Sequence, residues 1–179
     1  KKKVKILIVP YGILTRHNLT HFPKILKEKN IDIYYQPYYF CSPFIDKKIK
    51  VILTVFDLIH FFYPYLKSSL SRKLYHKLKI APRLVFRRAD KILTISINTS
   101  RDLIKNFRIP PRKIKMIYMG VSDNFRVIDT TRARKLMKEK FKVSKPYLLY
   151  VGRNEPHKNI KALVIAYARL PEYIRERYV

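Results

Sequence analysis

Short runs of β-branched and aromatic residues alternate along the chain with longer segments in which apolar residues recur every three or four positions. The short runs predict strands that are buried on both faces, and they span Val4–Val9, Ile31–Gln36, Val51–Phe56, Lys91–Ser96, Ile114–Met119 and Tyr147–Val151. The longer segments predict helices over Thr20–Lys29, Ser71–Ala89, Thr99–Phe107, Thr131–Lys142 and Asn159–Arg169. This alternation predicts an α/β fold with a parallel, Rossmann-like sheet flanked by helices.

A change of pattern after Gly120 predicts a boundary between two structural units. From Asp123 to Thr131 the chain carries turn residues and little apolar periodicity, which is typical of a connection. We therefore expect a first unit over residues 1–122, a connection with a basic helix over 123–146, and the start of a second unit over 147–179. The 179 residues are enough for one α/β domain with its own core and for little more.

One of the predicted helices carries a clear start signal. Asn98 is a residue type that caps helices, so the helix is expected to begin at Thr99. Asp102 would then lie in the first turn, where a negative charge interacts favourably with the helix dipole.

The composition excludes several classes of protein. Hydrophobic residues make up 47% and charged residues 29% of the chain, which is typical of a folded protein and not of a disordered one. With 3 glycines, the chain contains neither of the common glycine-rich phosphate-binding motifs. Cys41 is the only cysteine, which excludes an internal disulfide or a zinc site built on cysteines and favours a reducing compartment. The longest apolar stretch, Val51–Leu66, is interrupted by polar residues and a proline and is too short to cross a membrane.

The charge is strongly unbalanced. Forty Lys and Arg residues against 12 Asp and Glu residues give a net charge of +28, which predicts an anionic partner. A nucleic acid is one such partner, although the chain contains no known nucleic-acid-binding motif. An anionic membrane is another, contacted by the basic stretch Arg72–Lys79 together with Arg83, Arg87 and Arg88. Simple solvation of surface charge explains the imbalance equally well.

Two pairs of side chains have a chemical and a structural interpretation. His17 and His21 would share a helix face, but no third ligand lies near them, so a surface pair is favoured over a metal site. Ser96 and Ser100 lie between a predicted strand and a helix, where a nucleophile could sit. The sequence around them lacks the nucleophile-elbow motif, so helix capping is favoured.

Asp57 and an aromatic cluster lie at the ends of predicted strands. Asp57 follows an apolar strand at the edge where open α/β sheets bind ligands, and a site role and a structural role are equally supported. The aromatic cluster from Tyr34 to Phe40 could stack on a sugar or a base, but packing into the core is favoured.

The strongest local signal follows the run Tyr147–Val151. Gly152 would let the backbone turn sharply off the strand, Arg153 offers a fork of donors, and Lys158 places a positive charge beside the helix that starts at Asn159. Together they would form a diphosphate-binding loop. An exposed loop with two ordinary cations is the alternative, and spacing alone slightly favours it.

Five blocks of sequence, in this order, resemble family 4 glycosyltransferases of the GT-B fold. The blocks are Val51–Ile59, Arg88–Ser96, Ser100–Leu103, Lys115–Val121 and Tyr147–Asn159, and the resemblance covers Ile31–Leu170. It is closest to mannosyltransferases and other group 1 transferases. The resemblance implies an acceptor-side domain, here residues 1–122, and a nucleotide-sugar-binding domain that starts at 147–179.

The resemblance also implies a reaction and its partners. A sugar, mannose among the candidates, would pass with retention from a nucleotide-diphosphate sugar to a glycan or lipid-linked acceptor. No cofactor and no obligatory metal are implied, because the nucleotide sugar is a substrate. Such an enzyme would lie in the cytoplasm, with peripheral contact at the inner face of an anionic membrane, and nucleic acid is disfavoured as a partner. The alternative function is a basic nucleic-acid-binding α/β protein without catalysis.

The family's functional residues can be carried over to matching positions of this chain. Arg153 and Lys158 would hold the donor diphosphate and stabilise the charge on the leaving group, which makes them the predicted catalytic residues. The predicted substrate-binding residues are Gly120, which would allow close backbone approach at the interdomain cleft, Asp57 and Ser96 on the acceptor side, and Gly152 and Asn159 in the donor loop.

Three departures from the family pattern stand out. Phe56 occupies the position of a histidine that many relatives carry before the aspartate, and His60 is not an obvious substitute. The pair of glutamates eight positions apart that is usual in the donor domain is absent, and so is the glycine-rich loop of the first domain. We therefore expect a central fragment of a transferase, with exposed apolar surface near Tyr147–Val151 and with its activity as a separate chain undecided.

Overall fold

The computed structural model describes residues 6–10, 12, 15–62 and 80–178, and these divide into two compact units, Lys1–Gly120 and Val121–Val179. We call them unit 1 and unit 2. Each is described by itself.

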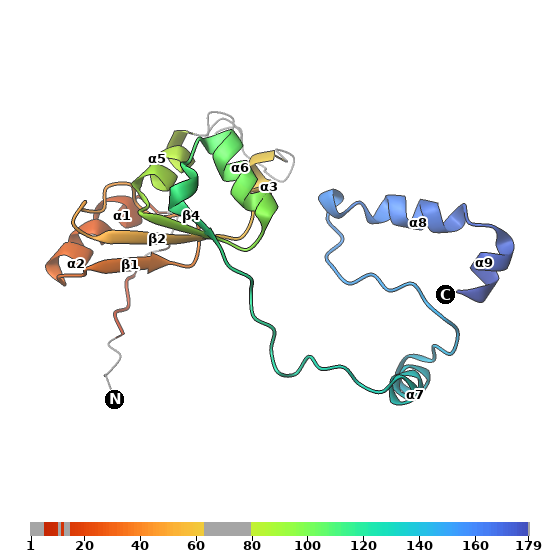
Figure 1. Ribbon diagram of the computed structural model, residues 1–179. Coiled ribbons are helices and arrows are strands. Elements are labelled where there is room, and N and C mark those ends of the chain that lie inside the picture. Colours follow the sequence, from red (N-terminus) through yellow and green to blue (C-terminus); the bar gives the residue numbers. More distant parts are fainter. Residues whose placement is uncertain (1–5, 11, 13–14, 63–79, 179) are drawn as a thin grey trace. The chain divides into compact units, whose positions relative to one another are not determined.

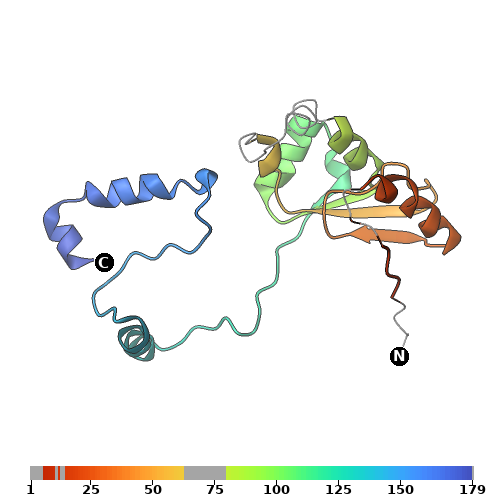
Figure 2. The same ribbon diagram turned by 180° about the vertical axis from the view of Figure 1, so that it is seen from behind.

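Unit 1 is built on a parallel sheet of four described strands in the order β1-β2-β3-β4 (Figure 1, and Figure 2 from behind). The strands are β1 (Ile33–Gln36), β2 (Lys50–Val55), β3 (Lys91–Thr94) and β4 (Ile114–Met116). The described helices of this unit are α1 (Arg16–Thr20), α2 (Phe22–Glu28), α3 (Ile59–Phe62), α5 (Ile80–Arg88) and α6 (Ile97–Phe107), with a 3₁₀ turn at Pro111–Lys113. The predicted α/β fold with a parallel sheet flanked by helices is therefore confirmed.

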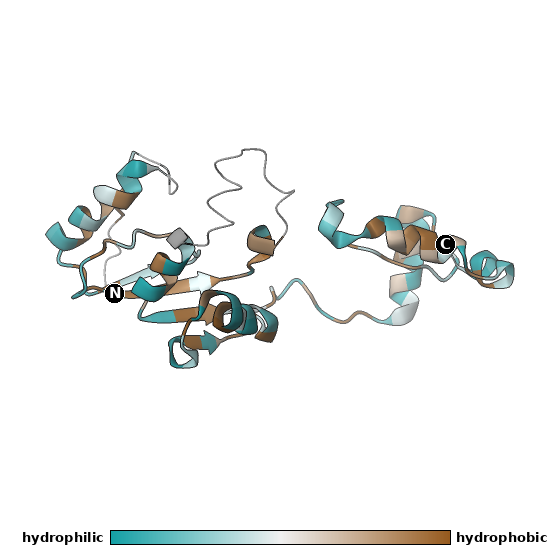
Figure 3. Cartoon of the chain, turned by 90° about the horizontal axis from the view of Figure 1, so that it is seen from above, coloured by the Kyte–Doolittle hydropathy of each residue, from teal (hydrophilic) through white to brown (hydrophobic). Residues whose placement is uncertain are grey.

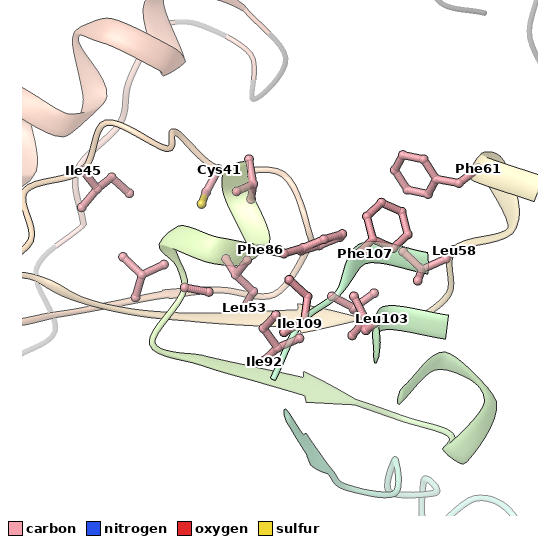
Figure 4. Close-up of a cluster of buried hydrophobic side chains, with 14 of the residues drawn as sticks. Cys41, Ile45, Leu53, Leu58, Phe61, Phe86, Ile92, Leu103, Phe107 and Ile109 are labelled. Carbon is pink, nitrogen blue, oxygen red and sulfur yellow. The ribbon is translucent and has the colours of Figure 1, made fainter. Parts of the chain in front are cut away.

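The core lies between the sheet and helices α5 and α6 (Figure 4). Successive strand residues point to opposite faces, so Val51, Leu53 and Val55 of β2 point to the same face, and all three are fully buried. Phe86 of α5 and Phe107 of α6 pack edge to face there, with ring centroids 5.1 Å apart. These alternating positions fix the register of the central strands, because a shift of one residue would expose them.

The prediction that strands are buried on both faces is correct for the centre of the sheet and wrong at its edge. On the second face of β2, Thr54 is buried and Ile52 is half-buried. On edge strand β1, in contrast, Ile33 is 61% and Tyr35 52% exposed. An edge strand has a neighbour on one side only, so the described residues cover it less completely.

Two of the helices differ in their bounds from the prediction. The expected helix over residues 20–29 is two short helices, α1 and α2, because Pro23 lacks an N–H donor and lies in the first turn of a new helix. Helix α6 starts two residues earlier than expected, because Ser96 and not Asn98 is its cap: the Ser96 hydroxyl accepts from the Thr99 N–H at 3.1 Å. Asp102 consequently lies beyond the first turn.

The amino-terminal strand prediction is wrong for the residues that the structure describes. Ile6–Val9 do not join the sheet, and Ile6 and Ile8 are 85% and 86% exposed. Val4 and Lys5 of that predicted strand lie outside the described residues, as does the part of the predicted helix at 71–79. The described end of that helix, α5, agrees with the prediction.

A network around Arg88 joins the loop before β2 to the turn between α5 and β3. The guanidinium of Arg88 donates to three main-chain carbonyls, those of Ile45 at 2.9 Å, Asp46 at 2.6 Å and Ile49 at 2.7 Å. It also pairs with Asp90, whose carboxylate accepts from the Val51 N–H at 2.9 Å. The Arg88 side chain is only 11% exposed, so these acceptors replace the water that it loses.

The surroundings of this network shift the pKa of Asp90 and of Lys113. Partial burial acts to raise the pKa of Asp90, but the Val51 N–H and the cations Lys50 and Arg88 outweigh it, and the pKa is lowered. Lys113 donates to the carbonyls of Arg87 and Ala89 at 2.8 and 2.7 Å, and desolvation lowers its pKa. Arg88, which the predicted basic face included, is turned inward, and the stretch Arg72–Lys79 of that face lies outside the described residues.

Burial also raises the pKa of two side chains in the core of unit 1, Cys41 and Tyr34. Desolvation raises the pKa of the Cys41 thiol to about 12, and the side chain is 1% exposed. Desolvation likewise raises the pKa of Tyr34, whose hydroxyl donates to Gln36 Oε1 at 2.8 Å. Both side chains belong to the packing of unit 1.

Unit 2 contains helices α7 (Thr130–Phe141), α8 (Ile160–Ala168) and α9 (Glu172–Arg177) and a 3₁₀ turn at Pro156–Lys158. Asp129 caps α7 by accepting from the Arg132 N–H at 3.0 Å. None of the described residues of unit 2 is buried, and Figure 3 shows the apolar character of α8, where Val164 is 60% exposed. Helical structure here rests on local bonds and capping.

The predicted strand Tyr147–Val151 does not form. These residues belong to no strand, and Leu149 and Val151 are 73% and 83% exposed. A strand needs a neighbouring strand to satisfy its N–H and C=O groups, and none of the described residues provides one. The exposed apolar surface expected at this place is therefore present, while the sheet has four described strands where six were predicted.

Replacing Arg88 by alanine should lower the free energy of unfolding of unit 1 by about 2–4 kcal/mol, because three carbonyls and the Asp90 carboxylate lose a buried donor. Arg87→Ala is the matched control, since the Arg87 side chain is exposed. Urea unfolding followed by circular dichroism measures both. Equal effects of the two substitutions would contradict the role assigned to the network.

Asp90 should contribute stability that depends on pH. Its folded-state pKa is below the ordinary value of 3.8, so its contribution is present at neutral pH and is lost as the pH falls through the folded pKa. Asp90→Asn should cost about 1 kcal/mol at pH 7, since the carboxylate is partly exposed, and progressively less below pH 4. Urea unfolding at several pH values, with Asp32→Asn as the control, tests this; a constant difference from pH 7 to pH 3 would refute it.

Candidate functional site

The carboxyl ends of β2 and β3 border a shallow hollow of about 370 Å³ in unit 1. It is lined by Asp57, Leu58, Ile59, Phe62, Asn98, Thr99 and Asp102. In open α/β sheets this edge is the usual place for a ligand. Of the two residues predicted for the acceptor side, Asp57 lines this hollow and Ser96 does not.

Asp57 also has a structural role in the turn that leads to α3. Its Oδ1 accepts from the Ile59 N–H at 3.0 Å, as an aspartate does when it closes a turn before a helix. The side chain remains exposed and lines the hollow, so it can serve both purposes. Its role in binding stays a prediction.

Ser96 belongs to a hydroxyl network at the same edge. Its Oγ lies 2.9 Å from the Thr99 hydroxyl, which donates to the Phe56 carbonyl at 3.2 Å, and so ties the end of β2 to the start of α6. Ser100 is hydrogen-bonded to Thr94 at 2.6 Å and to the Ser96 carbonyl at 3.1 Å. Ser96 therefore caps the helix, as favoured, and Ser100 ties the first turn of the helix to β3. The predicted role of Ser96 in substrate binding stays a prediction.

Gly120 ends unit 1 in an exposed stretch. A side-chain carbon added at this position would meet nothing within 4 Å, and the residue does not have a positive φ. Nothing in the described structure therefore requires glycine here, and the close approach at Gly120 stays a prediction.

Residues 152–159 of unit 2, which we call the donor loop after their predicted role, are held by hydrogen bonds between residues close in sequence. The Tyr150 hydroxyl donates to the Arg153 carbonyl at 3.3 Å, and the 3₁₀ turn at Pro156–Lys158 leads to Asn159 with a left-handed φ of 51°. Asn159 stands at the start of α8 but makes no capping bond with its side chain. Its position allows a role in binding, which stays a prediction.

Gly152 has a close neighbour in the structure instead of the backbone conformation that was expected of it. The residue does not have a positive φ, so it is not a sharp left-handed turn. A Cβ built on Gly152 would lie 2.5 Å from the Tyr150 hydroxyl oxygen, which is too close for real atoms. Glycine therefore makes room for the Tyr150 ring, which in turn holds the loop at Arg153.

Arg153 and Lys158 are exposed, and neither lines the hollows of unit 2 that border α7. The Arg153 guanidinium lies 3.4 Å from Glu155 Oε1, and its side chain is 88% exposed. The two cations are therefore accessible to an anion, but Glu155 competes for one of them. The diphosphate role of the two cations stays a prediction.

The loop also contains a contact between an acidic side chain and a histidine that the spacing of residues does not predict. Glu155 Oε2 lies 3.4 Å from Nδ1 of His157, whose side chain is only 8% exposed. Glu155 thus stands between the Arg153 guanidinium and a nearly buried imidazole. Spacing along the chain could not show this, because it depends on which way three side chains turn.

The remaining candidates behave as surface or core residues. His17 and His21 are exposed with ring centroids 5.0 Å apart, as a surface pair. In the aromatic cluster, Tyr34 and Tyr39 pack against the core, as favoured, whereas Tyr38 is 37% exposed.

Comparison with known proteins identifies the family. The profile of Glycosyltransferase Family 4 matches residues 2–125, more than half of the chain. The chain belongs to glycosyltransferase family 4. The family 4 match includes the whole sheet of unit 1 and both sides of the hollow at its carboxyl edge.

Individual relatives agree with this assignment. The chain is 34% identical over 94 residues to the serotype-specific mannosyltransferase WbdA of Escherichia coli, a match that covers 52% of this chain and 12% of that protein. It is 32% identical over 106 residues to a Campylobacter jejuni N-acetylgalactosamine-N,N'-diacetylbacillosaminyl-diphospho-undecaprenol 4-alpha-N-acetylgalactosaminyltransferase, covering 59% of this chain and 26% of the relative. The family 4 chain thus matches a minor part of each relative's length.

A solved structure supports the fold. The crystal structure of a glycosyltransferase from Rickettsia africae ESF-5 superposes with a TM-score of 0.50 at 19% identity, covering 94% of this chain and 43% of that one. At this identity the similarity establishes the fold alone. Among the described residues of the family 4 chain, none of the helices is long and apolar enough to cross a membrane.

Ser96→Ala should destabilise unit 1 by about 1 kcal/mol, because α6 loses the acceptor for its Thr99 N–H. Ser96→Asp should retain most of the stability, since aspartate caps a helix equally well. Thermal unfolding compares the three proteins. If alanine is neutral, or if aspartate is as harmful as alanine, the hydroxyl is not acting as a cap.

Proposed function

We propose that this chain is the part of a family 4 glycosyltransferase that carries the acceptor edge and the donor-diphosphate loop. The family match over residues 2–125 carries the assignment to a glycosyltransferase with the acceptor edge, and the two exposed cations Arg153 and Lys158 support the donor-diphosphate loop, which lies outside that match. The reaction is transfer of a sugar, with retention, from a nucleotide-diphosphate sugar to a glycan on a lipid carrier. Mannose is the proposed sugar, because the Escherichia coli relative is a mannosyltransferase, and the Campylobacter relative supports the lipid-linked acceptor.

In this proposal the bond between sugar C1 and the β-phosphate oxygen breaks, and the nucleoside diphosphate leaves with the electron pair. The acceptor hydroxyl oxygen forms the new bond to C1 from the same face, so its proton can pass to the departing phosphate oxygen. Negative charge therefore develops on the diphosphate in the transition state. Arg153 and Lys158 are the proposed groups that stabilise it.

The arrangement of the donor loop suggests how the cations act. Lys158 ends the 3₁₀ turn just before α8, and its side chain is exposed. The Arg153 guanidinium is paired with the Glu155 carboxylate. A diphosphate, which carries more negative charge, would have to displace that carboxylate in order to bind Arg153. Asp57 and Ser96 would border the acceptor, with Asp57 offering the carboxylate oxygen that does not accept from Ile59.

Titration calorimetry with GDP, UDP and ADP tests the donor loop. Lys158→Ala and Arg153→Ala should each weaken binding of the preferred nucleotide about 10-fold or more, as expected for a lost charge-assisted contact. Lys161→Ala is the matched control, because it removes an exposed cation one turn further along. Binding that all three substitutions weaken equally, or no binding of any of the nucleotides, would overturn the proposal for this loop.

A further inference from the structure

Helix α7 and the segment that follows it border a hollow in unit 2 with a volume of about 820 Å³. We define the basic hollow by its lining residues, which are Thr130, Ala133, Arg134, Lys135, Met137, Lys138, Val143, Ser144, Lys145, Pro146 and Tyr147. Four of these residues are cationic, and none of the described residues in the lining is acidic. The donor loop contributes nothing to it.

The hollow has an apolar floor and a cationic rim. Ala133 and Met137 lie one turn apart on α7 and are half-buried, as is Val143. Arg134 and Lys138, also one turn apart, lie beside them and are exposed. An amphipathic helix that lies on a membrane surface places its apolar side chains toward the acyl chains and its charges at the level of the lipid headgroups.

The nearby acidic groups do not cancel this charge. Glu139 lies 3.9 Å from Lys135 and is the acidic partner of that one rim cation, with both side chains exposed. Lys145 donates to the Glu176 main-chain carbonyl, which carries no full charge. Arg134 and Lys138 are in none of the ion pairs found among the described residues. Two uncompensated cations therefore stand over an apolar floor.

We infer that the basic hollow docks unit 2 on a bilayer that contains anionic phospholipid, with lipid phosphates at Arg134 and Lys138 and acyl carbons near Met137 and Tyr147. Charge complementarity identifies this partner, because zwitterionic lipid and neutral glycans offer the rim no net negative charge. The apolar floor favours lipid over a nucleic acid, whose phosphate backbone would leave Met137 and Val143 without a partner. This inference does not depend on sugar transfer.

Vesicle co-sedimentation tests the electrostatic part. The chain should bind vesicles of phosphatidylcholine with 30% phosphatidylglycerol at physiological salt and bind phosphatidylcholine alone far more weakly. Arg134→Ala with Lys138→Ala should weaken this binding about 30-fold, each cation near an anionic surface contributing similarly. Arg132→Ala with Lys140→Ala is the matched control, since it removes the same charge from α7 outside the hollow, and it should change binding less than about 3-fold.

Three results would overturn the inference. Equal loss in the two double variants would show that only net charge matters. Binding that is indifferent to phosphatidylglycerol would exclude the rim cations as the contact. Duplex DNA that binds more tightly than the vesicles at the same salt, and that loses affinity in Arg134→Ala with Lys138→Ala, would assign the hollow to nucleic acid.

Fluorescence tests the apolar part independently. The chain has no tryptophan, so Tyr147→Trp places a single indole in the hollow. Its emission should shift to shorter wavelength on anionic vesicles and be quenched by brominated lipid. Tyr118→Trp, at a position 79% exposed in unit 1, is the control and should show neither effect. Vesicle binding without a shift at position 147 would overturn the docking geometry.

Discussion

The packing of unit 1 depends on one guanidinium that replaces water for three main-chain carbonyls. Parallel strands bury their ends as well as their faces, so the carbonyls of the loop that enters β2 need donors from elsewhere in the chain. Arg88 supplies them from the end of α5, and Asp90 fixes the guanidinium while accepting from the first core residue of β2. This contact places β2 beside β3, and therefore determines where their carboxyl ends lie.

The same network explains why a sequence block can be characteristic of a family without touching a substrate. Arg88 and Asp90 belong to a block of the family resemblance, yet they lie at the amino end of the sheet, while the hollow with Asp57 lies at its carboxyl end. Ser96, at the far end of that block, holds the start of α6. The block thus spans β3 from its amino end to its carboxyl end.

Much of unit 1 could be predicted from the sequence because its signals are redundant. The runs around β2 and β3 are apolar, rich in β-branched residues and flanked by helices, so composition, strand propensity and element order all predict the same strands. The start of α6 could not be predicted as well, because Ser96 and Asn98 are both competent caps. The extended backbone of Ser96, with φ −147° and ψ 153°, decides between them, and only tertiary packing sets that conformation.

Unit 2 shows where local pattern is insufficient. Tyr147–Val151 has the composition of a strand, but strand formation needs a partner that a single segment cannot supply. The sequence shows that Arg153 and Lys158 lie in one loop, and their role there stays a prediction. The contact of Arg153 with Glu155 and the closeness of the Tyr150 ring to Gly152 depend on side-chain geometry, which the sequence does not show.

The burial of Cys41 has a practical consequence for chemical labelling. The chain has one cysteine, and its thiol is enclosed and has a pKa of about 12, so almost none of it is the reactive thiolate at neutral pH. A maleimide should therefore modify an engineered surface cysteine of the folded chain and leave Cys41 intact. The rate at which Cys41 itself is modified would then report how often unit 1 opens and exposes the thiol.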